Sequence, residues 1–273
     1  MFEYLFMQRA FVAGIILGAV VPCIGVVVVL KRLSLMGDAL SHSSLAGVAG
    51  GLIAGINPVA GATVACCAAA FGIEVVRRRF AGHADIAIAV IMSCGIGLAG
   101  VLSGFVPNSA SFSSFLFGSI VTVDNGELTA IALVGAGVLA LFLALQKELF
   151  LVTFDEEAAR LTGVRVQVVN ALFVLMTALA VSVAARTVGA LIVSSMMVVP
   201  VACALQLCRS WRSTVLASSG IGVGITAVGL VVAYELGLKP GGTIVLIGVA
   251  LLATILLAKG AARIARRLRG AER

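Results

Sequence analysis

The sequence predicts an all-α polytopic membrane protein of about nine transmembrane helices, with eight helices as the alternative. Of its 273 residues, 61% are hydrophobic and only 11% are charged, whereas soluble domains average about 45–50% apolar and about 25% charged residues. The apolar runs lack the period-two alternation that the strands of a membrane barrel show. This composition excludes a soluble enzyme and a disordered chain, and residues 1–273 are treated as one transmembrane domain.

Nine apolar ranges are predicted to cross the membrane as helices, each of which needs about 20 residues. The second range is short, and merging it with the third would give eight helices. Glu3, Gln8 and Arg9 precede the first range and no small-residue cleavage site follows, so we expect no cleavable signal peptide. The predicted ranges are 11–30, 44–56, 59–76, 86–103, 128–146, 168–185, 188–208, 213–235 and 243–259.

The distribution of Lys and Arg predicts the orientation of these helices, because loops on the cytosolic side are enriched in both residues. With nine helices and an outside amino terminus, all but three of the 19 Lys and Arg residues fall in cytosolic segments. The three on the outer side are Arg9, Arg186 and Lys239. We therefore expect the amino terminus outside and the carboxyl terminus in the cytoplasm.

Residues 259–273 are predicted to form a basic cytosolic tail. The segment carries six Lys or Arg residues and one acid, Glu272. Contact with anionic lipid of the inner leaflet explains such a cluster. Binding of nucleic acid is disfavoured, because no aromatic residue is interleaved among the basic ones.

Glycines recur at four-residue spacing within the predicted helices. In lipid, this spacing lets two helix backbones approach each other closely. We therefore expect close helix crossings at these positions. The sets are Gly14/Gly18, Gly47/Gly51/Gly55, Gly100/Gly104 and Gly220/Gly224.

Two ionisable residues lie at the entry to the second predicted helix. Asp38 and His42 are four residues apart, so on a helix they share one face. A carboxylate oxygen and an imidazole nitrogen suit Zn²⁺, Mn²⁺ or Fe²⁺, and ionisable groups next to an apolar span are costly and usually functional. A local hydrogen bond between the two side chains explains the pair equally well, so the residues alone leave both explanations open.

The predicted cytosolic loop of about residues 147–167 contains a short polar helix. Thr153 and Glu156 have the spacing of a capping box, and acidic residues occupy the first turn. Gly163 is expected to end the helix. Such an element is suited to docking onto a partner, although an ordinary surface helix has the same signature.

The chain carries no motif for ATP hydrolysis or for zinc-dependent proteolysis. Neither G-x-x-x-x-G-K-[ST] nor H-E-x-x-H occurs in it. An intramembrane enzyme would need further catalytic residues beside Asp38 and His42, and His83 lies in a separate arginine-rich loop. We therefore expect a protein that is not an enzyme and that binds no permanent cofactor.

Four segments, specific in this order and spacing, identify a family resemblance. They are RLSLMGDALSH at 32–42, LFGSI at 116–120, FDEEAARLTG at 154–163 and VGALIVSSMMVVPVA at 188–202. Nearly end to end, the chain resembles the integral membrane permease of the ATP-binding-cassette importers for zinc, manganese or iron. One position departs from the family pattern: Ala46 stands before Gly47, where members often have proline.

The resemblance implies a homodimeric permease of the bacterial plasma (inner) membrane with the type II importer fold, similar to the vitamin B12 importer. A second copy of the chain would complete a central metal pathway. Two cytosolic ATP-binding subunits would dock below and hydrolyse the ATP, and an extracytoplasmic metal-binding protein would dock above.

The same resemblance implies roles for individual residues. Asp38 and His42 would be metal ligands along the pathway, and the loop segment would be the helix that couples the permease to the ATPase. We expect its small face, Ala158 and Ala159, to pack into an ATPase groove. The coupling residues would be Phe154, Asp155, Glu156, Glu157, Ala158, Ala159, Arg160, Leu161 and Gly163.

A secondary metal transporter or a channel, working without an ATPase, is the alternative function. Such a protein would also place Asp and His in the membrane, but it would need no docking helix. The transported metal stays open, because one Asp and one His accept zinc, manganese or iron(II), and the general affinity order alone favours zinc.

Overall fold

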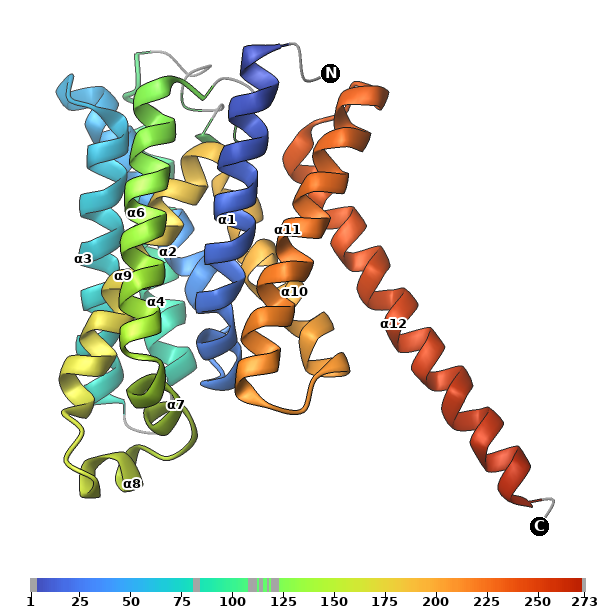
Figure 1. Cartoon of the computed structure of the whole chain (residues 1–273). Coiled ribbons are helices and arrows are strands. Elements are labelled where there is room, and N and C mark those ends of the chain that lie inside the picture. Colours follow the sequence, from blue (N-terminus) through green and yellow to red (C-terminus); the bar gives the residue numbers. More distant parts are fainter. Residues whose placement is uncertain are drawn as a thin grey trace.

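The computed structural model describes residues 4–80, 84–107, 112, 115–116, 118 and 123–271. These residues contain eleven α-helices and no β-strand, which confirms the predicted all-α fold. Nine of the described helices are long and run between the two ends of one bundle, and two short ones lie at its lower end (Figure 1). The long helices are α1 (Leu5–Leu30), α2 (Met36–Ala54), α3 (Pro58–Arg79), α4 (Ala84–Ser103), α6 (Asn125–Ala144), α9 (Val166–Val188), α10 (Ala190–Leu207), α11 (Trp211–Leu236) and α12 (Pro240–Ala271); the short ones are α7 (Gln146–Phe154) and α8 (Glu156–Leu161).

Seven of the described helices are long and apolar enough to cross a membrane, namely α1, α3, α4, α6, α9, α11 and α12. Each of the nine predicted ranges corresponds to a long helix, but nine membrane crossings are not confirmed by length and composition. The apolar part of α10 is short, Ile192–Leu207. α2 has sufficient length, but it carries Asp38, His42 and three serines, which lower its hydropathy.

The observed helices extend the predicted ranges most at three places. α1 begins at Leu5 instead of 11, α2 begins at Met36 instead of 44, and α12 continues to Ala271 instead of ending at 259. The predictions followed runs of apolar residues, whereas a helix continues over polar residues wherever its backbone stays hydrogen-bonded. α2 and α3 are separate helices, because Gly55 (φ 67°) ends the first and Pro58 begins the second.

α2 is packed against four other helices, α3, α4, α9 and α10. Its glycines permit this close packing: a Cβ on Gly47 would collide with the backbone carbonyl of Gly61 on α3. A Cβ on Gly37 would lie 3.3 Å from the Cα of Ser194 on α10, and one on Gly95 of α4 would meet the backbone nitrogen of Ser43 at 2.9 Å. Small residues at helix interfaces therefore allow protein, instead of lipid, to cover this polar helix.

The predicted close crossings are confirmed at some of the glycines. Gly18 of α1 packs directly on the backbone of Gly222 of α11, so this crossing uses Gly222 in place of Gly220 and Gly224. A Cβ on Gly220, Gly224 or Gly100 would meet nothing within 4 Å. Spacing alone identified glycine-rich helix faces, but it could not tell which of them meet another helix.

The bundle has a basic end, defined as the end at which α1 finishes, α2 begins and α8 lies (Figure 1). A cavity of about 580 Å³ at this end is lined by Lys31, Arg77 and Arg160, among other residues. Arg186 and Lys239 lie at the opposite end, at the end of α9 and just before α12. This separation matches the pattern from which the orientation was predicted; which end faces the cytosol stays a prediction.

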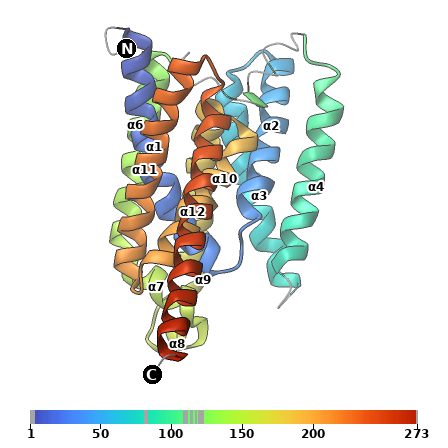
Figure 2. The same cartoon turned by 90° about the vertical axis from the view of Figure 1, so that its right-hand side faces the viewer.

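The predicted basic tail is a direct continuation of α12 as far as Ala271. The second half of α12 diverges from the other helices (Figure 1), and the view turned by 90° shows α12 in front of α10 and α9 (Figure 2). The side chains of residues 263–271 and residues 272–273 lie outside the described part of the chain. The proposed contact of this tail with lipid stays a prediction.

Replacing Gly47 by alanine tests whether the α2–α3 crossing depends on a missing side chain. The added methyl would collide with the backbone of Gly61, and overpacking of this kind costs about 1–3 kcal/mol. We expect Gly47→Ala to lower the midpoint of thermal unfolding in detergent and the amount of inserted protein.

Gly100→Ala is the matched control, because a Cβ at Gly100 meets nothing within 4 Å. Its unfolding midpoint should equal or exceed that of the unaltered chain. Equal midpoints for Gly47→Ala and Gly100→Ala would contradict the close crossing.

Candidate functional site

Asp38 and His42 lie in the first two turns of α2, as the four-residue spacing predicted. Both side chains are partly exposed. In the part of the chain that the structure describes, neither makes a hydrogen bond or an ion pair, with the other or with any third residue. The alternative explanation, a local Asp–His hydrogen bond, is therefore not observed.

Two side-chain hydrogen bonds reach backbone carbonyls in this part of α2. The Ser43 hydroxyl donates to the Ala39 carbonyl oxygen at 2.8 Å, and the Cys66 thiol of α3 donates to the Leu40 carbonyl oxygen at 3.2 Å. The buried hydroxyl of Ser41 has no hydrogen-bond partner among the described residues. An unpaired carboxylate and imidazole on a helix enclosed by protein are groups that could bind a passing cation.

One copy of the chain provides an incomplete ligand set for a metal. Within the described residues, no group of three or more His, Cys, Asp or Glu side chains could hold an ion. Stable zinc sites, for comparison, use three or four protein ligands. The pair on α2 fits either a transient ion or a site to which a second copy contributes.

The loop predicted to be cytosolic contains two short helices, α7 and α8, instead of the single one predicted. Thr153 lies inside α7, where its hydroxyl donates to the Leu149 carbonyl oxygen, so the predicted capping box from Thr153 is wrong. Asp155 caps α8 instead, because its extended backbone lets the carboxylate accept from the backbone nitrogens of Glu157 and Ala158 at 3.0 and 2.9 Å. The helix ends at Leu161, and Gly163 follows with φ 85°.

The exposed side of α8 differs from the predicted one. Ala159 is 0% exposed and is buried within its own chain, so the expectation that it is presented to a partner is wrong. Leu161 is 90% exposed and Phe154, just before the helix, is 62% exposed. The open surface of this segment is therefore a mixture of Leu161, Phe154 and the charged residues Asp155, Glu157 and Arg160.

An aromatic cluster, formed by Phe150, Phe154 and Trp211, lies beside α8. The ring centroid of Phe150 lies 4.9 Å from that of Phe154 and 5.6 Å from that of Trp211. It joins α7 to the beginning of α11. Sequence analysis missed Phe150 and Trp211 as neighbours of this segment, because the two helices are joined only by tertiary packing.

A network of polar contacts connects α8 to three transmembrane helices at the basic end. The Lys31 ammonium donates to Oδ1 of Asn170 at 2.6 Å, and Nδ2 of Asn170 donates to Oε1 of Glu156 at 3.1 Å. Glu156 also lies 3.7 Å from Lys31 and 3.9 Å from Arg77. Arg77 in turn pairs with Glu74 at 3.0 Å.

Lys31 is the most enclosed cation of this network. Its side chain is 8% exposed, and burial lowers its pKa to about 8 although the nearby Glu156 carboxylate opposes the shift. The Arg77 guanidinium adds to the lowering, while Glu74 acts in the other direction. Lys31 and Asn170 were not predicted as site residues, because they belong to α1 and α9 and are far from α8 in sequence.

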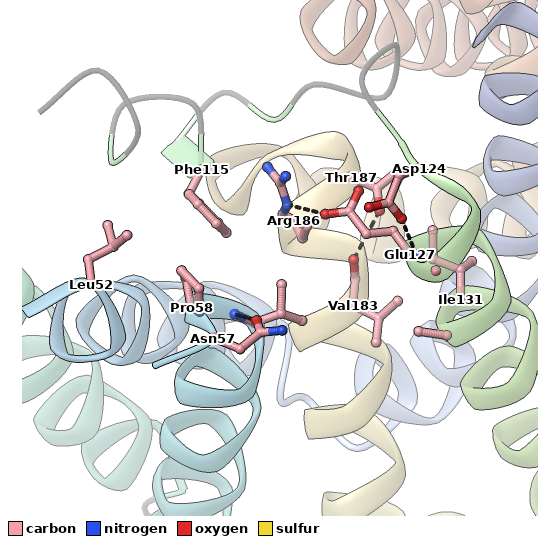
Figure 3. A pocket seen from close by; sticks show the side chains of 13 residues that line it. Leu52, Asn57, Pro58, Phe115, Asp124, Glu127, Ile131, Val183, Arg186 and Thr187 are labelled. Carbon is pink, nitrogen blue, oxygen red and sulfur yellow. Dashed lines mark hydrogen bonds and ion pairs between the residues drawn. The ribbon is translucent and has the colours of Figure 1, made fainter. Parts of the chain in front are cut away.

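A cavity of about 680 Å³ opens at the opposite end of the bundle (Figure 3). Arg186 at the end of α9 donates to Oε1 of Glu127 at 2.9 Å, which joins α9 to the start of α6. The guanidinium also lies 4.6 Å from the centre of the Phe115 ring. Asp124 caps α6 by accepting from the backbone nitrogen of Glu127 at 2.6 Å, so the polar groups here are largely paired.

Parts of three of the four segments that carried the family resemblance meet inside the bundle. Gly37 packs against Ser194, and a Cβ on Gly118 would collide with the backbone of Val188 and Gly189. Gly118 and Gly189 both have positive φ, 70° and 108°, which favours glycine. Residues 117, 119 and 120 of the LFGSI segment lie outside the described residues.

Comparison with known proteins now identifies the family. Residues 3–259 match the family described as the ABC 3 transport family. The chain belongs to this ABC 3 family. The structure also matches the one titled "PsaBC from Streptococcus pneumoniae in complex with Fab", with a TM-score of 0.83, 30% identity and coverage of 93% of this chain and 91% of the other.

Relatives of this ABC 3 family protein carry metal-transport names. A Treponema pallidum protein named "Probable metal transport system membrane protein" is 36% identical over 261 residues, which cover 94% of this chain and 96% of the relative. The protein of Streptococcus parasanguinis named "Manganese import system permease protein ScaB" is 32% identical, with coverage of 89% and 87%. Together with the seven apolar helices, these matches establish a multi-pass membrane protein of the ABC 3 permease family.

The lowered pKa of Lys31 predicts a specific dependence of stability on pH. The unfolded chain keeps the Lys31 proton up to about pH 10.5, whereas the folded chain releases it near pH 8, so the unfolded state binds more protons in this window. The free energy of unfolding should therefore gain a contribution that rises with pH between 8 and 10.5, on the order of 3 kcal/mol over the whole window. Unfolding midpoints at pH 7.5 and 9.5 measure it.

The variant Lys31→Met removes the titrating group and should lose this gain. Lys147→Met serves as the control, because Lys147 is exposed, and it should keep the pH dependence of the unaltered chain. The same pH dependence in Lys31→Met would show that Lys31 does not titrate in this range.

Proposed function

We propose that this chain is the membrane-spanning permease subunit of an ATP-driven importer of a divalent transition metal ion, and that it works as a homodimer. The observation that carries the proposal is the pair Asp38 and His42, which has no partner among the described residues and lies on an enclosed helix. Membership of the ABC 3 family supports the importer class.

Manganese is the cargo that we propose first. Relatives that match over most of the chain are named as manganese import proteins, and a carboxylate together with an imidazole suits Mn²⁺ as well as Zn²⁺ and Fe²⁺. Two copies of the chain facing each other would present two aspartates and two histidines. One chain provides two ligands, and a homodimer would provide four.

We further propose that all nine long helices cross the bacterial plasma membrane, with the basic end in the cytoplasm and the amino terminus outside. The 19 residues of α2 extend over about 28 Å at 1.5 Å per residue, close to the hydrocarbon thickness of about 30 Å. The charge bias supports this orientation. Four neighbouring helices surround α2. Because α2 would cross the membrane in contact with protein instead of lipid, it can carry polar residues.

The exposed surface around α8 is proposed to dock a cytosolic ATP-binding subunit, one on each copy of the permease. Leu161 and Phe154 form an exposed apolar surface beside charged residues, a combination that fits a protein groove better than water. An extracytoplasmic metal-binding protein would deliver the ion at the opposite end. ATP hydrolysis would occur on the docked subunits, since this chain carries no nucleotide motif.

The metal pair can be tested without disturbing the fold. Neither Asp38 nor His42 makes a hydrogen bond or ion pair within the described residues, so the double variant Asp38→Asn/His42→Gln should change stability by less than about 1 kcal/mol. We expect manganese uptake in reconstituted vesicles to fall to background, because the neutral amides are far weaker ligands than a carboxylate and an imidazole.

Asp85→Asn is the matched control, since it neutralises an exposed aspartate in the first turn of α4, and it should transport normally. Normal uptake by the Asp38/His42 double variant would remove this pair from the mechanism.

Leu161→Glu tests the docking surface. Leu161 is 90% exposed, so the change should alter stability by no more than about 0.5 kcal/mol. In a docked complex, the new carboxylate would be buried without a partner, at a cost of several kcal/mol. We expect an inserted permease that no longer copurifies with its ATP-binding subunit.

Arg209→Gln is the control, because it changes an exposed residue in the separate turn between α10 and α11. It should copurify normally. If Leu161→Glu copurified and transported as well as the control, docking through α8 would be refuted, and a channel or secondary transporter would become the better proposal.

A further inference from the structure

Glu156 connects α8 to the transmembrane helices. In the described part of the chain, it is the α8 side chain whose polar contacts reach other long helices: Asn170 of α9 at 3.1 Å, Lys31 after α1 at 3.7 Å and Arg77 of α3 at 3.9 Å. Asp155, by contrast, caps α8 itself. A movement of α8 would therefore reach α1, α3 and α9 most directly through Glu156.

The network around Glu156 converges on Lys31. The Lys31 ammonium is held by Asn170 at 2.6 Å, and Asn170 simultaneously binds Glu156. One asparagine thus bridges an anion on α8 and a cation at the end of α1. Both charges and the bridging amide belong to different helices, so the three groups fix α8, α1 and α9 relative to one another.

A tight turn leads from Lys31 to α2, the helix that carries Asp38 and His42. Arg32 has φ 59°, the one positive φ of a non-glycine residue within the described residues, and this conformation is unfavourable for an L-residue. The turn is closed by hydrogen bonds from the nitrogen of Leu33 to the Val28 oxygen and from the nitrogen of Met36 to the Leu33 oxygen, both at 2.8 Å. Leu33 and Met36 are 6% and 0% exposed.

Electrostatics make the Glu156–Lys31 contact sensitive to the position of α8. Lys31 is 8% exposed, and the Arg77 guanidinium beside it has the same charge. If α8 moved away, Lys31 would keep its hydrogen bond to Asn170 and the weaker attraction of Glu74, but it would lose the adjacent Glu156 carboxylate. A buried charge that loses its nearest counter-ion is destabilised, so displacement of α8 favours a compensating shift of Lys31 and the turn behind it.

We propose that Glu156, Asn170 and Lys31 form the positioning link between the docking helix and the metal helix. Binding of an ATP-binding subunit to α8 sets the position of Glu156, and this contact sets the position of the turn at 31–36, from which α2 carries Asp38 and His42. The inference rests on the proposed function and assigns transmission, not metal binding or ATP hydrolysis, to the three residues.

The test uses the complete permease–ATPase complex in proteoliposomes, with its metal-binding protein outside, and measures manganese uptake and ATP hydrolysis in the same vesicles. Glu156→Gln and Lys31→Met remove one charge each at nearly constant size. We expect both variants to copurify with the ATPase and to hydrolyse ATP, while the manganese imported per ATP falls about fivefold or more.

Further variants distinguish transmission through this contact from a purely structural role. In the double variant Lys31→Met/Glu156→Gln, the manganese imported per ATP should fall no further than in either single variant, because each single change already removes the same contact. Lys31→Arg keeps the charge and should retain coupling. Asp85→Asn neutralises an exposed acid of α4 that lies outside the docking surface, and it should import manganese at the normal ratio to ATP.

Three results would overturn the link: a normal ratio in Glu156→Gln, additive losses in the double variant, or loss of inserted permease in every contact variant while Asp85→Asn folds normally. Failure of the proposed function is recognised separately. If the unaltered complex imported manganese without ATP, the importer itself would be refuted. An ATP-driven complex that is indifferent to Glu156→Gln would refute only the positioning link.

Discussion

A helix that is too polar for lipid must be enclosed by protein, and α2 imposes this constraint on the whole bundle. Glycines allow neighbouring helices to approach α2 closely: Gly47 packs on the backbone of Gly61, and Gly37 packs on Ser194. Asp38 and His42 are the ionisable groups of α2, and both are left unpaired within the described residues. The enclosure thus creates a place where a cation can meet a carboxylate and an imidazole away from lipid.

The sequence predicted most of the architecture, because long apolar runs and charge bias are properties of the chain itself. It placed a helix at each of nine ranges and put Asp38 and His42 on one of them. It began α2 too late, at 44, because the predicted range followed the apolar run and left out the polar stretch around Asp38. It also assigned the wrong cap to α8, since nothing local showed that α7 continues through Thr153 to Phe154.

Tertiary contacts explain what the sequence could not predict. Ala159 was expected to face a partner, but packing of α8 against its own chain buries it. Lys31 and Asn170, which lie 139 residues apart, meet at 2.6 Å, and no local pattern relates them. The exposed surface of α8 and the network at the basic end therefore emerged only from the folded chain, and the network joins α8 to α1, α3 and α9.

The central claim is that the transported metal passes along α2 at Asp38 and His42. Anomalous X-ray scattering at the manganese edge, from crystals of the permease–ATPase complex soaked in Mn²⁺, tests this most directly. The account predicts an anomalous peak within about 2.0–2.3 Å of an Asp38 carboxylate oxygen and a His42 ring nitrogen, the range of first-row metal–ligand distances. A peak at other residues of the membrane domain, with none at this pair, would contradict it.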